Sequence, residues 1–236
     1  MDISCAGLPQ LRDPSTRRPW RRVSLIIMLP AGTHLDDRDP EPYGSRPTDT
    51  DQLVVMHGVD WRTYGALREL IDSPGIRMTY LEGALEIMSP SRRHEHEKTT
   101  IARMIEIFAL ERDFALLGYG STTFKREARE RGLEPDECYC VGHDLDEAPD
   151  IALEIVITSG GINKLAVYRG LGVKEVWIFR DGRFQIYALQ GDQYLLIDKS
   201  GMVPELDFAA MEELVKIPDQ HAAVKAFRDR LRTPPR

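Results

Sequence analysis

Hydrophobic residues recur every three or four positions in four segments of the chain, a spacing that is typical of amphipathic helices. In the first segment, Trp61, Tyr64 and Leu67 share one face, Asp60 is a candidate N-cap, and Pro74 stands just beyond the pattern. The four predicted helices cover residues 51–72, 94–111, 162–170 and 211–217.

Short apolar or alternating runs between these helices predict strands. Glu82-Gly83 and Asp181-Gly182 each separate two such runs and predict hairpin turns. The run over residues 150–158 is almost wholly apolar, as expected of a central strand that is buried on both faces. The predicted strands cover residues 76–81, 84–87, 114–117, 121–126, 136–141, 150–158, 173–179, 184–189 and 194–197.

The predicted core order is helix, strand, strand, strand, helix, strand, followed by a β-meander. This order indicates an α/β fold in which helices cover a mixed sheet, with an additional hairpin on its N-terminal side. The periodic segments define a single domain over residues 51–217. Residues 1–50 are rich in Pro, Arg, Asp and Gly and are predicted to form a poorly ordered arm, and residues 218–236 a charged tail.

Composition narrows the class of protein. A net charge of −7 over 236 residues argues against a protein that coats DNA nonspecifically, but it permits an enzyme whose basic residues line one cleft. Three cysteines, Cys5, Cys138 and Cys140, fit a reducing cytoplasm and lack the partners that a zinc finger needs. The apolar run at residues 23–30 is far too short to span a bilayer. We therefore expect a cytoplasmic protein with no membrane segment.

A carboxylate stands inside the apolar run at residues 150–158, where an unpaired charge is costly. Strand alternation places Asp150, Ala152 and Glu154 on one face, and Ala152 leaves room beside the two acids. Asp136 begins the preceding predicted strand, and Lys164 follows Glu154 by ten positions. Carboxylates suit Mg²⁺, which polarises a phosphodiester, and a nearby lysine stabilises the charge that develops.

Each of these residues also has a purely structural interpretation, in which it neither binds a metal nor takes part in catalysis. Asp136 and Asp150 follow prolines, as turn or strand-start residues do. Glu154 suits a salt bridge at a strand edge, and Lys164 suits a solvated helix position. Spacing alone therefore leaves the metal site open.

Several longer sequence motifs resemble those of the Uma2 family of restriction-endonuclease-like proteins. The resemblance covers roughly residues 58–200, in the family's order. The motifs that show this resemblance are MSPSRRHEHEK (88–98), GYGSTTFKRE (118–127), GLEPDECYCVG (132–142) and PDIALEIVITSGGINKLAVYRGLGVKEVWIF (149–179). It implies the PD-(D/E)XK nuclease fold, with a core of order αβββαβ, and Mg²⁺-dependent hydrolysis of phosphodiester bonds.

The resemblance also implies roles for particular residues. Asp136 takes the position of the motif aspartate and metal ligand, and Glu154 that of the second acid. Val156 stands where the motif lysine belongs, so Lys164 from the following helix is the expected substitute. Asp150 lies in a second Pro-Asp pair and is an alternative metal ligand.

The SPSxxHE segment offers a further acid at the start of a helix. Glu95 is the candidate for this role, with His94 beside it, although His94 and His96 also suit an exposed helix start. Glu82 in the YLEG hairpin matches the family as well, and turn geometry with Gly83 explains it equally.

Three functions are compatible with these residues and with the resemblance. The first is a DNA endonuclease that uses Mg²⁺, or Mn²⁺ in its place. The second is a catalytically silent, dimeric binding or regulatory protein with a degenerate nuclease fold, favoured by the acidic charge and by Val156. The third is a phosphodiesterase acting on RNA or a small substrate. A homodimer is expected from the resemblance and from the apolar surface that a β-meander offers.

Overall fold

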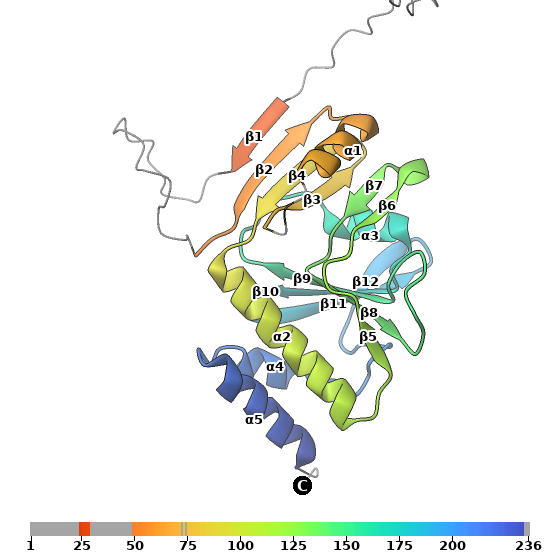
Figure 1. Ribbon diagram of the computed structural model, residues 1–236. Helices are drawn as coiled ribbons and strands as arrows, with labels where there is room; N and C mark the ends of the chain where they lie inside the picture. The colour runs from red at the N-terminus through yellow and green to blue at the C-terminus, as the bar shows by residue number, and fades with distance from the viewer. Residues whose placement is uncertain (1–23, 29–48, 72, 74, 234–236) are drawn as a thin grey trace, which may run out of the picture.

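The computed structural model describes residues 24–28, 49–71, 73 and 75–233, and within them the strands form two six-stranded sheets. The arm predicted over residues 1–50 therefore lies almost entirely outside the described residues. Sheet A has the strand order β1-β2-β4-β3-β7-β6 and sheet B the order β12-β11-β10-β9-β8-β5 (Figure 1).

The strands of the two sheets are three to eight residues long. Sheet A contains β1 (Ser24–Met28), β2 (Gln52–His57), β3 (Arg77–Leu81), β4 (Ala84–Ser89), β6 (Phe124–Arg126) and β7 (Arg131–Leu133). Sheet B contains β5 (Leu116–Gly118), β8 (Glu137–Val141), β9 (Ile151–Val156), β10 (Glu175–Arg180), β11 (Arg183–Gln190) and β12 (Gln193–Ile197). The helices are α1 (Trp61–Leu70), α2 (Arg92–Glu111), α3 (Lys164–Leu171), α4 (Phe208–Leu214) and α5 (Gln220–Arg232).

The α/β prediction is confirmed. Sheet B and its helices follow the chain order α2, β5, β8, β9, α3, β10, which is the expected succession αβββαβ. Strand β9 pairs parallel to β10 and antiparallel to β8, and α3 makes the crossover that a parallel pair requires. The predicted hairpin β3–β4 and the meander β10–β11–β12 are both present.

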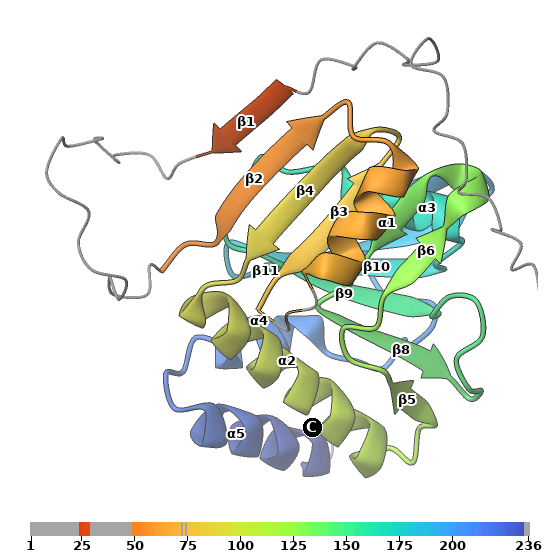
Figure 2. The same ribbon diagram turned by 45° about the horizontal axis from the view of Figure 1, so that its top comes forward.

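Helices cover sheet B on both faces. Helix α2 lies across one face, and α5 runs along α2 on the outer side (Figure 2). The core on this face includes Ile105, Phe108, Leu153, Trp177 and Phe227. On the opposite face, α3 packs between sheet B and the strands β6 and β7 of sheet A, so this second face is the one turned toward sheet A.

Besides β1, which lies inside the predicted arm and pairs with β2, the structure differs from the predicted elements in three main places. Residues 52–57 form β2 rather than the start of the first helix, and Gly58 at φ +79° turns the chain before Asp60 caps α1. Strand β7 forms inside the predicted loop 127–135, because it pairs with β3 and β6 from distant parts of the chain. The pattern of a three-residue strand is too short to be recognised without those partners.

The charged segment after residue 218 contains the third difference, helix α5. Ala223, Val224 and Phe227 are buried at helical spacing, while the charged residues point outward. Helix α4 likewise begins at Phe208, earlier than predicted, because Asp207 accepts a hydrogen bond from the Ala210 N–H at 2.9 Å. None of the helices among the described residues is long and apolar enough to cross a membrane.

Candidate active site

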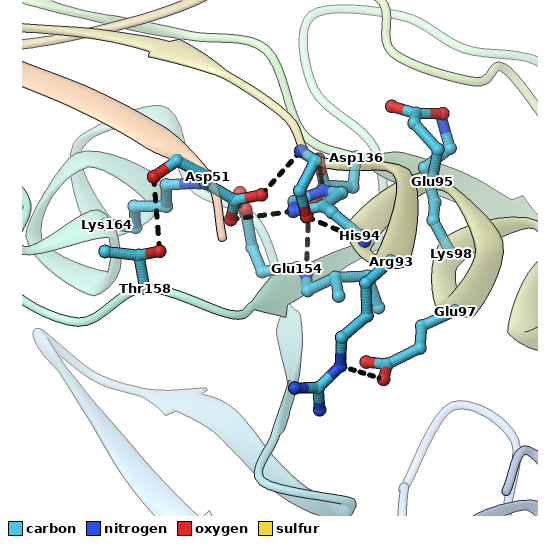
Figure 3. Close-up of polar contacts among 12 residues, drawn as sticks. Asp51, Arg93, His94, Glu95, Glu97, Lys98, Asp136, Glu154, Thr158 and Lys164 are labelled. Atoms are coloured by element: carbon cyan, nitrogen blue, oxygen red, sulfur yellow. Dashed lines mark hydrogen bonds and ion pairs between the residues drawn. The ribbon is translucent and has the colours of Figure 1, made fainter. Parts of the chain in front are cut away.

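The two acids singled out in the sequence are neighbours because of the register between β8 and β9. Glu137 pairs with Leu153 in this antiparallel ladder, so Asp136, one residue earlier, lies level with Glu154. Both carboxylates are buried, and both side chains lie in the group drawn in Figure 3. The tertiary structure therefore brings together Asp136 and Glu154 as the sequence predicted.

Lys164 reaches Glu154 from the first turn of α3. Its Nζ lies 2.5 Å from Glu154 Oε2, and the Tyr168 hydroxyl donates a hydrogen bond to Oε1 of the same carboxylate. Lys164 and Tyr168 are four residues apart and so share one face of α3. Asn163 caps this helix by accepting the Ala166 N–H at 3.3 Å, which fixes where the first turn begins.

Asp136 is held by the start of α2 and by the backbone of β9. Its Oδ2 accepts the Ile155 N–H at 2.7 Å, and its Oδ1 lies 2.9 Å from His94 Nε2. The other ring nitrogen of His94, Nδ1, lies 3.1 Å from Asp51 Oδ2. Asp51 in turn accepts the Ser91 N–H at 2.8 Å. His94 therefore connects two buried carboxylates, with both ring nitrogens engaged.

The electrostatics of this row favour a charged imidazole. Burial alone would lower the pKa of His94, but hydrogen bonds and charge from Asp136 and Asp51 raise it to about 10. Burial would raise the pKa of Asp136, and the hydrogen bond and charge of His94, with Lys164 nearby, bring it below its usual value. The pKa of Asp51 is lowered in the same way against its own burial. The row is thus an ionised Asp–His–Asp arrangement.

The contributions to the pKa of Glu154 differ from those at Asp136 and Asp51. Its pKa is raised to about 7, chiefly because the carboxyl group is completely buried; the negative charge of Asp136 also raises this pKa, whereas the Lys164 ammonium and the Tyr168 hydroxyl lower it. Burial by itself would lower the pKa of Lys164, but Glu154, Asp136 and Glu86 raise it. A bound cation would therefore favour the ionised form of Glu154, since a nearby positive charge lowers a carboxyl pKa.

Glu86 on β4 is a fourth buried carboxylate at this site, which the sequence analysis missed. Its Oε2 accepts the Ile162 N–H at 2.7 Å, and Gly161 allows this approach, because a Cβ there would lie 2.0 Å from Oε2. An acid within the apolar stretch of β4 was the available signal. Asp51 was also missed, because it lies in a segment that the pattern assigned to a helix.

A pocket of about 280 Å³ opens beside these groups. Glu154, Lys164, Glu86 and Asp51 line it together with the loop 158–163 and parts of β10 and β11. The pocket lies between sheet A and sheet B, so residues that are far apart in the sequence share one cavity.

Asp150 does not join this group. It lies just before β9, four residues from Glu154, which at about 3.3 Å per strand residue is roughly 13 Å. Its carboxylate accepts the Val141 N–H at 2.8 Å and pairs with Lys174 at 2.6 Å and His143 at 2.9 Å. Among the described residues, Cys140, His143 and Asp150 could offer ligand atoms to a metal. Lys174 already neutralises that carboxylate, however, so we assign Asp150 a structural role.

Glu95 also lies apart from the two central acids. Its side chain is 43% exposed, pairs with Lys98 at 2.6 Å, and points away from Asp136 and Glu154 in Figure 3. His94 and Glu95 are adjacent in sequence, but the helix directs them to different sides. Of the SPSxxHE segment, His94 enters the site through its side chain, and Ser91 contributes as the N-cap of α2.

Asp136 and Glu154 form a suitable donor set for a divalent cation. Mg²⁺ favours hard oxygen ligands and usually takes one or two protein carboxylates, completing its shell with water and phosphate oxygens. The two level carboxylates, the partly buried Lys164 beside them and the element order αβββαβ together define a nuclease-like protein.

The match to a protein-family model agrees with this class. A family model matches residues 61–215, and the chain belongs to that family, Uma2, which is described as "putative restriction endonuclease". A similar solved structure is that of "a putative nuclease belonging to DUF820" from Anabaena variabilis ATCC 29413. The two chains are 14% identical, with a TM-score of 0.38, over 65% of this chain and 90% of the other. No protein with a curated description matches.

Proposed function

We propose that this protein is a metal-dependent endonuclease that hydrolyses phosphodiester bonds in DNA, with Mg²⁺, or alternatively Mn²⁺, as its cofactor. The observation that carries the proposal is the placement of Lys164 Nζ at 2.5 Å from Glu154, level with Asp136 on the adjacent strand. Val156 leaves the usual motif position without a lysine, and Lys164 supplies the missing ammonium from α3.

Each residue then has a role. Asp136 and Glu154 would hold the cation, which when bound polarises the phosphodiester and lowers the pKa of its water. Lys164 would stabilise the negative charge that develops on the phosphate, since a fixed cation in a buried site acts strongly. His94 positions Asp136 by occupying one of its oxygens, and Asp51 holds the imidazole. Glu95 and Asp150 have no part in this set.

Plasmid nicking tests the proposal with a matched control. Supercoiled DNA is incubated with Mg²⁺ or Mn²⁺ and with wild type, Glu154→Gln or Glu95→Gln. We expect EDTA to abolish nicking, Glu154→Gln to reduce it by at least about 100-fold, and Glu95→Gln to leave it within about twofold. Equal nicking by wild type and Glu154→Gln would reject the site.

One observation favours a second function, the catalytically silent binding or regulatory protein. Every carboxylate oxygen of Asp136 and Glu154 already contacts a protein group, so a cation must displace some of these contacts. Isothermal titration with Mn²⁺ separates the alternatives. A silent protein should bind no metal in a manner that depends on Glu154, whereas the nuclease should lose binding in Glu154→Gln.

The substrate class, the oligomeric state and the cellular setting are part of the same proposal. A panel of plasmid DNA, single-stranded DNA, RNA and a small diester distinguishes a DNase from the other phosphodiesterases. A homodimer remains our expectation, with edge strand β12 as its candidate surface. A reducing, cytoplasmic setting is proposed because Cys138 and Cys140 are buried free thiols.

A further inference from the structure

The pocket beside Glu154 and Lys164 extends along sheet B to Arg180, Gln185 and Tyr187. We propose that these three side chains form a subsite for a phosphate group adjacent to the one that is cleaved. The inference rests on the proposed function and deepens it, because it identifies the substrate as a polynucleotide chain rather than an isolated phosphodiester.

Strand register places this subsite relative to the acids. Glu154 pairs with Ile178 in the parallel pair β9–β10, and Ile178 pairs with Gln185 in the antiparallel pair β10–β11. Residues directly opposite each other lie on the same face of a sheet. Glu154 and Gln185 therefore lie in one row on the face turned toward α3 and sheet A.

Arg180 lies on that same face, two residues beyond Ile178 on β10. It is displaced from Glu154 by one strand, about 4.8 Å, and by two residues along the strand, about 6.6 Å. Its long side chain begins beside the acids and lines the same pocket. This offset suits contact with a neighbouring phosphate of a chain whose scissile phosphate lies at Glu154 and Lys164.

The polar groups of the subsite are available to a ligand. Within the part of the chain that the structure describes, the side chains of Arg180, Gln185 and Tyr187 make no hydrogen bond or ion pair with another residue, and Arg180 is exposed. By contrast, Lys164 is bound to Glu154, and Arg93 near the start of α2 is bound to Glu97. Arg180 is thus a pocket-lining cation whose charge is not already neutralised by a nearby acid.

The chemistry of the three groups favours phosphate. A guanidinium donates two parallel hydrogen bonds to phosphate oxygens, and the amide of Gln185 and the hydroxyl of Tyr187 can each donate one more. A cation at this rim also offsets the acidic net charge of the protein where an anionic chain would approach.

Binding is measured first, because it does not depend on turnover. A fluorescein-labelled DNA duplex is titrated in EDTA with wild type, Arg180→Ala, Arg180→Lys and Arg62→Ala, and anisotropy is recorded at several salt concentrations. Arg62 is an exposed arginine on α1 outside the pocket, so it controls for the change in net charge.

We expect Arg180→Ala to weaken binding about 10-fold, as loss of a charge-assisted contact does, and to reduce the slope of log K against log salt by about 0.9. Arg180→Lys should keep most of the salt slope but regain only part of the affinity. Arg62→Ala should stay within about twofold of wild type. Unchanged affinity and slope in Arg180→Ala would overturn the subsite.

A second measurement separates the subsite from the cleavage centre. Bis(p-nitrophenyl) phosphate has no flanking phosphate, so with Mn²⁺ its kcat/KM should be equal in wild type and Arg180→Ala, while the KM for plasmid rises about 10-fold. An equal loss on both substrates would place Arg180 at the scissile phosphate and refute the inference. If wild type hydrolyses neither substrate, the proposed function fails, and the binding titration still decides whether the subsite exists.

Discussion

At the scale of single residues, the main feature of the candidate site is a buried carboxylate on a central strand. Glu154 is 0% exposed and depends on Lys164 and Tyr168 to remain compatible with the interior. His94 provides a second case, because it is buried between Asp51 and Asp136. Each contact therefore serves both stability and the geometry of the acids.

Replacing Lys164 with Met tests this dependence. We expect Lys164→Met to lower the free energy of unfolding by about 3 kcal/mol, because removing one partner leaves a buried charge unpaired. The double variant Glu154→Gln/Lys164→Met removes both charges and should recover part of that loss. Urea unfolding followed by circular dichroism measures both. A double variant less stable than Lys164→Met would contradict the paired arrangement.

The pKa of His94 gives a pH dependence whose sign follows from linkage. The pKa is about 10 in the folded state and 6.5 as its ordinary value, so the folded protein binds the proton more tightly. This contribution, on the order of a few kcal/mol, is complete below pH 6.5 and is lost as the pH rises through about 10.

The measurement compares wild type with His94→Gln in metal-free buffer. We expect the free energy of unfolding of wild type to fall between pH 6.5 and 10, and that of His94→Gln to fall much less over the same range. Parallel curves for the two proteins would show that His94 is not the group responsible.

At the scale of elements, the turn between β9 and α3 positions Lys164, the proposed catalytic lysine. Asn163 caps α3, the Ile162 N–H binds Glu86, and Gly161 leaves room for that carboxylate. The turn therefore joins sheet A to the helix that carries Lys164, and small changes in its backbone should move the ammonium relative to Glu154.

Gly161→Ala tests the turn. Its Cβ would lie 2.0 Å from Glu86 Oε2, so we expect a loss of about 1–3 kcal/mol of stability and a reduced rate of nicking. Gly65→Ala on α1 is the matched control, because no heavy atom lies within 4 Å of the added Cβ. That substitution should stabilise the protein by about 0.5–1 kcal/mol. Thermal unfolding and the plasmid assay compare the two, and wild-type stability in Gly161→Ala would exclude a tight turn.

At the scale of the whole molecule, the two sheets meet at the candidate active site and leave β12 as an edge of sheet B. Leu196 on this edge is 64% exposed, and Leu195 beside it is also exposed. An exposed apolar edge strand is a template for pairing with a second copy.

We expect wild type to sediment as a dimer and Leu196→Glu as a monomer. Leu70→Glu changes a leucine that is 82% exposed on α1, and it should leave the dimer intact. Equilibrium ultracentrifugation measures the oligomeric state of the three proteins. A monomeric wild type would refute the expected homodimer, and a dimeric Leu196→Glu would move the interface away from β12.

Local patterns predicted most helices and strands, because periodicity and capping act over a few residues. Asp60 as the cap of α1, the hairpin at Glu82-Gly83 and the buried run of β9 all follow from neighbours in the sequence. Strands β2 and β7 and helix α5 were missed, because their burial depends on partners that are distant in the chain.

The sequence by itself determined the α/β order, the family resemblance and the face shared by Ala152 and Glu154, since these depend on period and spacing. Only the tertiary structure decided which carboxylates converge. Register set Asp136 level with Glu154 and left Asp150 at the far end, and helix direction turned His94 inward and Glu95 outward. The packing of sheet A against sheet B added Asp51 and Glu86. These outcomes depend on contacts between segments far apart in the chain, which the spacing of residues along it does not encode.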